Sequence, residues 1–267
     1  MKALLLTLVI LTSAVAQTVN TGNVNGLMAA ASRPESGGKI EIEAADDFIL
    51  DPGLSISGLQ SVNHATFTGL LTGSATVADI EAVTVEIYRV FPNDSASPSG
   101  NVPTRVNSPA DNALDDRSTL DGNLKFTATV LNSTFAAANS VLNGIHPKPD
   151  QTTMGEGPVT GTEVFIDVTF TTPFDLPADH LFFVPQVQVN GAEFMWLSSV
   201  RPIVSPGIPF APDLQAWIRN ENLDPDWLRI GTDIVGGATP PTFNMTFTLD
   251  AAPESSDILF LDFFFGS

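Results

Sequence analysis

Residues 80–91 read IEAVTVEIYRVF and have the clearest periodicity in the chain. Val83, Val85 and Ile87 are each separated by one polar or aromatic residue, so the aliphatic side chains share one face of an extended chain. This period of two predicts a β-strand with one aliphatic face and one mixed face. Pro92, which cannot donate a hydrogen bond to a sheet, follows directly and ends the predicted strand.

Similar segments recur along the chain, separated by turn residues. The sequence contains 18 Phe but only one Tyr, and 20 Gly and 20 Pro interrupt stretches rich in Val, Thr and Ile. Such a composition favours strands that end at Pro or Gly. We therefore predict an all-β protein, an antiparallel β-sandwich or jelly roll with long irregular loops. The other predicted strands are 39–44, 45–50, 54–56, 61–71, 124–131, 163–171, 181–189, 194–197 and 243–249.

The segments between the predicted strands are long. Because they lack a clear period, they are predicted to be irregular loops, which at this length are either functional or disordered. Pro185, inside the strand predicted at 181–189, favours an edge position or a bulge. The predicted loops are 93–123, 143–161 and 200–242, with short helical turns or irregular pieces at 27–31, 135–142 and 212–219.

The N-terminus has the features of a secretory signal peptide. Lys2 supplies a positive charge, residues 3–15 form an apolar run, and the small residues up to Ala16 suit cleavage before Gln17. The protein is thus predicted to be secreted or held at the cell surface, with no membrane-spanning segment after cleavage. The predicted organisation is a signal peptide at 1–16, a leader at 17–38, a single β-sandwich domain at 39–250, and a linker with a Phe-rich tail at 251–267.

Charge and cysteine content narrow the function further. The chain has 11 Lys plus Arg against 30 Asp plus Glu, which gives a formal net charge of −19. A chain with this charge repels nucleic acids, so no nucleic-acid partner is expected. There is no cysteine, which excludes a disulfide framework, a thiolate metal site and a Cys nucleophile.

An acidic stretch in the first long loop is the best candidate for binding a metal ion. Ca²⁺ takes several oxygen ligands, which flexible loops supply, and it is the one cofactor that the sequence suggests. The spacing differs from that of an EF-hand, and the alternative is that these side chains cap turns and stay hydrated. The candidate ligands are Asp111, Asp115, Asp116 and Asp121.

Two Trp-x-Arg units lie ten residues apart around an acidic turn. They are Trp217 with Arg219 and Trp227 with Arg229. Arg can stack on Trp and pair with Asp, so one interpretation is a pinned loop that covers the open end of the sandwich. The other is an aromatic platform for a glycan, to which Trp196 would also contribute.

Catalytic motifs are weak. No Gly-x-Ser-x-Gly or His-Glu-x-x-His pattern occurs, and His64, His146 and His180 stand far apart in the sequence. Carboxylates are so frequent that no glycosidase pair stands out. The sequence therefore predicts that the protein is not an enzyme.

Several short motifs are similar to those of one group of proteins. They are ADDF at 45–48, FTGL at 67–70, VEIYRVFP at 85–92, RVNSP at 105–109, LPADH at 176–180 and DLQAW at 213–217. Over most of residues 40–250 the chain resembles secreted bacterial β-sandwich proteins, many of which end in a PEP-CTERM sorting tail. The resemblance implies an exported surface or matrix protein and carries no known activity. Residues 252–255, APES, depart from the Pro-Glu-Pro motif of such a tail, and neither a spanning helix nor terminal arginines follow.

Taken together, the sequence predicts an exported, non-enzymatic surface, extracellular-matrix or adhesion protein. Sheet edges and the Phe-rich tail favour self-association into an oligomer or filament. One alternative is a module that binds extracellular polysaccharide through Trp217 and Trp227. A second alternative is a secreted hydrolase.

Overall fold

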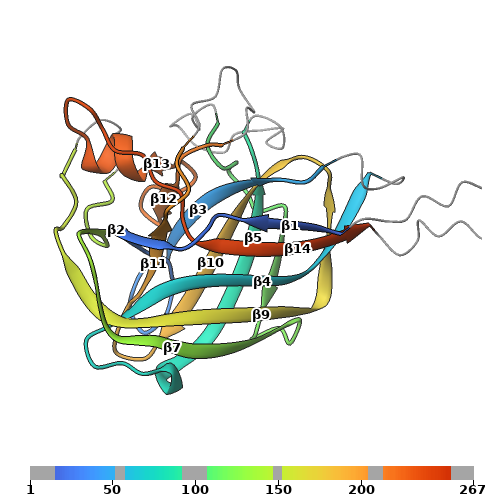
Figure 1. The fold of residues 1–267 in the computed structure, drawn as a ribbon, viewed down its shortest axis with the longest axis horizontal. Coiled ribbons are helices and arrows are strands. Elements are labelled where there is room, and N and C mark those ends of the chain that lie inside the picture. Colours follow the sequence, from blue (N-terminus) through green and yellow to red (C-terminus); the bar gives the residue numbers. More distant parts are fainter. Residues whose placement is uncertain (1–15, 52–57, 92–106, 147–151, 204–212, 254–267) are drawn as a thin grey trace, which may run out of the picture.

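The computed structural model describes residues 16–51, 58–91, 107–146, 152–203 and 213–253. Over these residues the chain consists almost entirely of β-strands, which form two sheets packed face to face (Figure 1). This confirms the predicted all-β sandwich. The signal peptide apart from Ala16, the strand predicted at 54–56 and the tail from residue 254 lie outside the described residues.

The larger sheet has eight strands, with β4 (Leu59–Thr72) near its centre. On one side β4 pairs with β9 (Val159–Pro177), and β9 pairs with β7 (Leu124–Ala137). On the other side different parts of β4 pair with β14 (Phe247–Pro253) and with β11 (Phe194–Ser199). The remaining strands extend from these two: β1 (Gln17–Asn20) pairs with β14, β2 (Val24–Ala31) pairs with β11, and β8 (Asn139–Val141) pairs with β2.

The smaller sheet has six antiparallel strands that run behind the larger sheet in Figure 1. A 3₁₀ turn, η2 (Val77–Asp79), leads into β5, and a π-helical turn, η3 (Ile230–Val235), follows β13. Within the described segments, no helix has the length and apolar character needed to cross a membrane. The strand order is β13 (Leu228–Arg229), β12 (Trp217–Asn220), β3 (Ile42–Ile49), β10 (His180–Val189), β5 (Ile80–Arg89) and β6 (Asp115–Ser118).

Aromatic side chains hold the two sheets together. Phe183 on β10 of the smaller sheet is fully buried and contacts three rings of the larger sheet. Its ring centroid lies 6.2 Å from that of Phe67, 6.0 Å from that of Trp196 and 5.1 Å from that of Phe247. The edge-to-face and offset arrangements are those that aromatic pairs prefer. The alternation of apolar residues along the strands thus produces the inter-sheet core that the sequence predicts.

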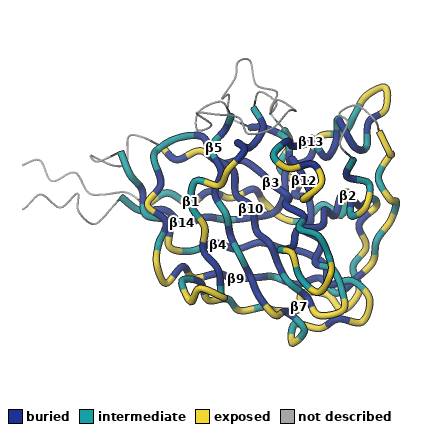
Figure 2. Tube along the Cα trace, turned by 180° about the vertical axis from the view of Figure 1, so that it is seen from behind, coloured by how far each residue is buried: buried dark blue, intermediate teal, exposed yellow. Residues whose placement is uncertain are grey.

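The smaller sheet is also covered on its outer face. A second apolar cluster lies there, built from sheet residues and from the segment around β12 and β13. As a result β3 and β10 are buried along most of their length, as the dark blue of these strands in Figure 2 shows. The members are Ala45, Tyr88, Val90, Phe182, Val184, Leu214, Trp217 and Trp227. The face of 80–91 that the sequence presents as mixed is therefore largely buried.

The predicted leader at 17–38 is wrong, because its residues belong to the sandwich. Residues 17–20 form β1 and residues 24–31 form β2, so both segments are strands of the sandwich. The helical turn predicted at 27–31 is instead a strand in which Met28 to Ala31 are fully buried. A run of small apolar residues has no alternation when both of its faces are covered. The sandwich also extends beyond residue 250, since β14 continues to Pro253.

Other predicted irregular regions also contain strands. Residues 135–142 hold the end of β7 and all of β8, and β12 begins at Trp217 inside the turn predicted at 212–219. β6 lies within the loop predicted at 93–123. The edge position predicted from Pro185 is wrong as well, because β10 lies between β3 and β5. The ladder with β3 ends at Phe183, so the missing N–H of Pro185 falls beyond it.

Candidate functional site

The two Trp-x-Arg units form neighbouring strands at one edge of the smaller sheet. Trp217 on β12 is opposite Arg229 on β13, and Arg219 is opposite Glu43 on β3. Because side chains alternate along β12, Trp217 and Arg219 point to the same outer face of the sheet. This register brings Arg219 onto the charged positions of β3.

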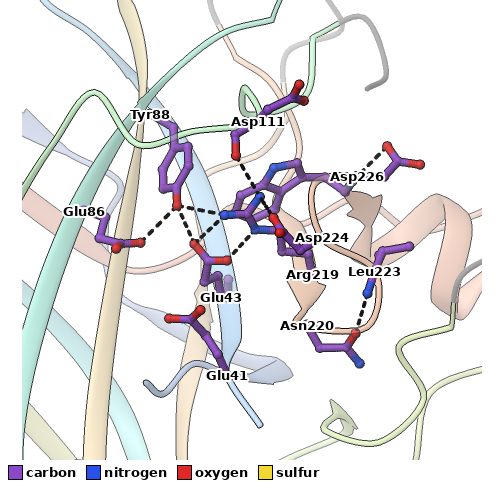
Figure 3. Close-up of polar contacts among 12 residues, drawn as sticks. Glu41, Glu43, Glu86, Tyr88, Asp111, Arg219, Asn220, Leu223, Asp224 and Asp226 are labelled. Atoms are coloured by element: carbon purple, nitrogen blue, oxygen red, sulfur yellow. Dashed lines mark hydrogen bonds and ion pairs between the residues drawn. The ribbon is translucent and has the colours of Figure 1, made fainter. Parts of the chain in front are cut away.

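Arg219 forms a buried ion pair with Glu43, shown in Figure 3. The side chains are 7% and 4% exposed. The Arg219 Nε donates to Glu43 Oε2, and Nη2 lies 3.1 Å from Oε1, so the contact is bidentate. Nη1 also donates to the Asp111 carbonyl at 3.1 Å and lies 2.7 Å from an Asp224 carboxylate oxygen. One guanidinium therefore connects β3 to two covering segments.

Two aromatic rings enclose the same guanidinium. Its carbon lies 4.4 Å from the ring centroid of Trp227 and 5.3 Å from that of Tyr88. These two rings meet edge to face at 5.4 Å. The guanidinium of Arg229, from the second unit, lies 5.9 Å from the ring of Trp217 in the first, so each Arg contacts the Trp of the other unit. The predicted stacking of Arg on Trp is confirmed, and here it holds the covering segment against the sheet.

The Tyr88 hydroxyl links Glu43 to Glu86 on β5. Its hydroxyl lies 2.6 Å from Glu43 Oε1 and 3.1 Å from Glu86 Oε2, and Arg219 Nη2 donates to it at 2.9 Å. Burial, followed by repulsion from Glu43, raises the pKa of Glu86 to about 9. Burial and the Glu43 charge also raise the pKa of Glu41. Glu86 is thus protonated at neutral pH, next to the Glu43 side chain that Arg219 binds.

Two adjacent carboxyl groups, one with a raised pKa, are the kind of arrangement that acid and base pairs use. A glycosidase needs the ionised member to reach water or a sugar carbon. Here both oxygens of Glu43 are held, one by Arg219 Nε and the other by Tyr88 and Arg219 Nη2, and the side chain is buried. The arrangement is therefore suited to holding the segment around β12 and β13, here called the cover, against the smaller sheet rather than to attack on a substrate.

Glu86 makes the stability of the sandwich depend on pH. We expect Glu86→Gln to raise the melting temperature at pH 9 and to change it little at pH 4. Folding raises the pKa of Glu86 from 4.5 to about 9, so the protonated form's contribution is complete below pH 4.5 and is lost as pH rises through about 9. Melting curves across this range test it, with exposed Glu35→Gln as a control for charge. A difference that does not grow with pH contradicts the expectation.

A second buried polar cluster fastens the other end of β3. His180 Nε2 lies 2.5 Å from Asp47 Oδ2, and Asp47 Oδ1 accepts from the Leu214 N–H at 2.9 Å. Asp46 points the opposite way, and its Oδ2 accepts from the Met245 N–H at 2.7 Å. Burial raises the pKa of both carboxyls, and the neighbouring Asp47 adds to the effect on Asp46. Asp46 and Asp47 thus connect β3 to His180 on β10 and to the segments that contain Leu214 and Met245.

The four predicted Ca²⁺ ligands are not brought together. Asp115 pairs with Arg117 at 2.7 Å, and Arg117 also donates to the carbonyls of Thr172 and Pro173. Asp111 is buried beside Arg219, whereas Asp116 and Asp121 are exposed. Over the described ranges, no three His, Asp or Glu side chains cluster as a metal site would require. These four residues therefore do not converge on one point, because Arg117 holds Asp115 and the segment around Arg219 lies against Asp111.

The predicted tryptophan platform is also corrected. Trp196 and Trp227 are 0% exposed and Trp217 is 3% exposed, so the rings offer no surface on which a sugar could stack. Trp196 lies in the inter-sheet core, where its Nε1 donates to the Thr246 carbonyl at 2.8 Å. Arg219 is committed to Glu43, and Arg229 lies 2.8 Å from an Asp233 carboxylate oxygen. Sequence spacing predicts the Trp and Arg contacts but does not reveal that a loop covers them.

The outer face of the larger sheet contains a groove that sequence reasoning missed, with Thr66 and Thr68, 9% and 8% exposed, at its floor. Its volume is about 380 Å³. Thr66, Thr68 and Thr248 alternate along β4 and β14 with the core residues Phe67 and Phe247, so the threonines point outward. On the same face His64 lies between Asp250 and Asp167, at 2.9 and 3.2 Å. The repeated Thr of 61–71 was the one signal for this face.

Comparisons with known proteins give no relative for this chain. No protein-family model, no curated protein and no solved structure matches it.

Proposed function

We propose that this protein is an exported, non-catalytic component of the cell surface or extracellular matrix, and that its copies join through the edge of β7. The signal peptide predicted at 1–16 and the resemblance to secreted sandwich proteins support export. The fastening of Glu43 by Arg219 supports a role without catalysis. The observation that carries the proposal is the free edge of β7.

Within the described part of the chain, β7 pairs with β9 alone and leaves its other side unpaired. It is 14 residues long, contains no proline, and has Lys125 near its start as its one charged residue. Over residues 124–130 it follows β9 without a register shift, and its two register shifts come after Val130. Such an edge is a template for another strand unless charge, proline or a bulge protects it.

The other described edge strands are short or charged. β1 and β6 have four residues each, β8 has three and β13 has two. β6 also carries Asp115, Asp116 and Arg117. Because short edges resist pairing, β7 is the edge that offers the longest stretch for another strand.

A second copy of this chain is the partner that fits this edge. Two β7 strands can pair antiparallel about a twofold axis, which makes the contact self-complementary. Val130 and Leu131, which are 47% and 50% exposed, would then gain apolar contacts. The net charge of −19 opposes association at long range, but Lys125 is the one charged residue of β7, so few like charges meet across the pair.

Light scattering coupled to size-exclusion chromatography tests the proposal. We expect the chain from Gln17 to elute as a species whose mass increases with protein concentration. Thr129→Lys should leave a monomer, because the two copies would place lysines near one another across the new pair. Thr18→Lys adds the same charge to β1 at another edge and should associate as the wild type does. A monomer at every concentration would end the proposal.

A further inference from the structure

We propose that the groove on the outer face of the larger sheet binds a neutral saccharide chain. The inference rests on the proposed surface or matrix function and names a ligand class for it. The groove is a different site from the buried tryptophans and shares none of their residues. Its volume of about 380 Å³ lies within the range of ligand pockets, roughly 300–1,000 Å³.

The groove is formed by two walls that stand on either side of the sheet face. One wall is the turn between β1 and β2, at residues 22–24, and the other is the part of β7 from Leu131 to Phe135. Register shifts on β7 between Val130 and Asn132, and between Asn132 and Phe135, displace this part of the strand. Bulges re-aim side chains and are common beside binding sites. The two walls meet at one end of the groove, where Gly26 of β2 lies against Phe135 and Ala136 of β7.

The floor and walls carry hydroxyl and amide groups. Thr66, Thr68 and Thr248 lie on the floor, and Asn20 and Asn23 lie at the β1–β2 wall. The Thr66 and Thr248 hydroxyls are 2.6 Å apart, and either can donate. Hydroxyls and carboxamides both donate and accept, as the hydroxyls of a sugar do. A pocket of this composition can therefore bond a polyol whichever way its hydroxyls turn.

Two aromatic rings complete the groove. Phe165 on β9 and Phe135 on β7 line it, and both are half-buried. The face of an aromatic ring is electron-rich, so it attracts the polarised C–H bonds on the flat side of a sugar ring. The groove thus offers stacking together with hydrogen bonds, the combination that fits the two sides of a pyranose.

Charge decides between classes of saccharide. No Lys or Arg lines the groove, whereas the carboxylate of Glu163 does, with Asn132 as its hydrogen-bond partner. The whole chain carries a net charge of −19. A uronate, sulfate or phosphate would meet repulsion with no cation to offset it. The ligand is therefore an uncharged saccharide.

The groove runs across the strands, which favours a chain of sugars over a single one. From β1 through β14, β4 and β9 to β7 there are four spacings of about 4.8 Å, or roughly 19 Å. Lining residues come from strands along this whole path. An extended saccharide laid across the sheet can contact the floor and both walls together.

Native gels containing a soluble polysaccharide test the inference on the chain from Gln17. We expect retardation by at least one of laminarin, dextran and galactomannan, and none by alginate, the anionic probe. Phe165→Ala and Asn23→Ala should each raise the dissociation constant for the neutral polysaccharide about tenfold or more. Thr127→Ala, on the same face outside the groove, should bind as the wild type does. Gels without polysaccharide correct for changes in association.

Three results would overturn the inference. They are no retardation by any neutral probe, equal retardation by alginate, and wild-type retardation of both groove variants. Because Phe165 is half-buried, melting curves establish that its variant folds, and Asn23→Ala carries the test if it does not. A chain that associates in light scattering but is not retarded overturns the groove alone. A retarded monomer overturns the pairing of β7 alone.

Discussion

Arg219→Met is expected to lower the free energy of unfolding by about 3–5 kcal/mol. The substitution leaves the Glu43 carboxylate buried without its cation, because the remaining partner, the Tyr88 hydroxyl, supplies one hydrogen bond and no charge. It also removes the contacts of the guanidinium with Trp227 and with the Asp111 carbonyl. Urea unfolding followed by tryptophan fluorescence measures the loss.

The double variant Glu43→Leu/Arg219→Met is the matched control for this prediction. Removing both charges leaves no buried carboxylate without a partner, so most of the lost stability should return. Arg33→Met is a second control. It breaks the ion pair in which Arg33 lies 2.8 Å from Glu193, and it should lower the free energy of unfolding less, since Lys39 Nζ also lies 2.8 Å from that carboxylate. If the single and double variants are equally unstable, the buried ion pair is not what fastens the cover.

Phe183→Ala is expected to cost about 3–5 kcal/mol by a different route. The ring is fully buried between the sheets, in contact with Phe67, Trp196 and Phe247. Its removal leaves a cavity lined by large rings that cannot close over it without leaving their rotamers. The loss should appear in urea unfolding and as reduced near-ultraviolet circular dichroism from the remaining aromatic residues.

Phe183→Leu separates the loss of volume from the loss of ring contacts. A leucine fills much of the space, so its cost should be clearly smaller than that of alanine. Phe126→Ala is a second control, because that ring lies on β7 and is only partly buried. Equal effects at Phe183 and Phe126 would show that the sheets are not joined by the aromatic cluster.

Most of the strands that could be predicted have one face toward the core and a different environment on the other. The segments 61–71, 80–91 and 163–171 correspond to β4, β5 and β9 because their apolar residues alternate. The segment 181–189 corresponds to β10, which is covered on both faces and is predicted from its near-continuous run of large apolar residues. β2 escaped prediction since both of its faces are covered, and β12 since its strand lies in a Pro-rich region. Periodicity detects a strand only where it has two different environments.

In the candidate site, too, some contacts could be predicted from the sequence and others could not. The Arg and Trp contacts were predictable because both units lie close in the sequence and combine groups that attract each other. The pairing of Arg219 with Glu43 was not, since the two residues are 176 positions apart and meet through strand register. The groove has the same difficulty, because its floor and walls come from several separate strands. Ordinary Thr, Asn and Phe residues become a site only after the chain has folded.

Hydrogen exchange at the β7 edge tests the central claim most directly. The claim is that this strand is left open in the single chain and closed by a second copy. Amide groups of residues 124–130 that point away from β9 should exchange rapidly in dilute solution and slowly in concentrated solution, while those bonded to β9 stay protected at both. Exchange at this edge that is the same at both concentrations would contradict the account.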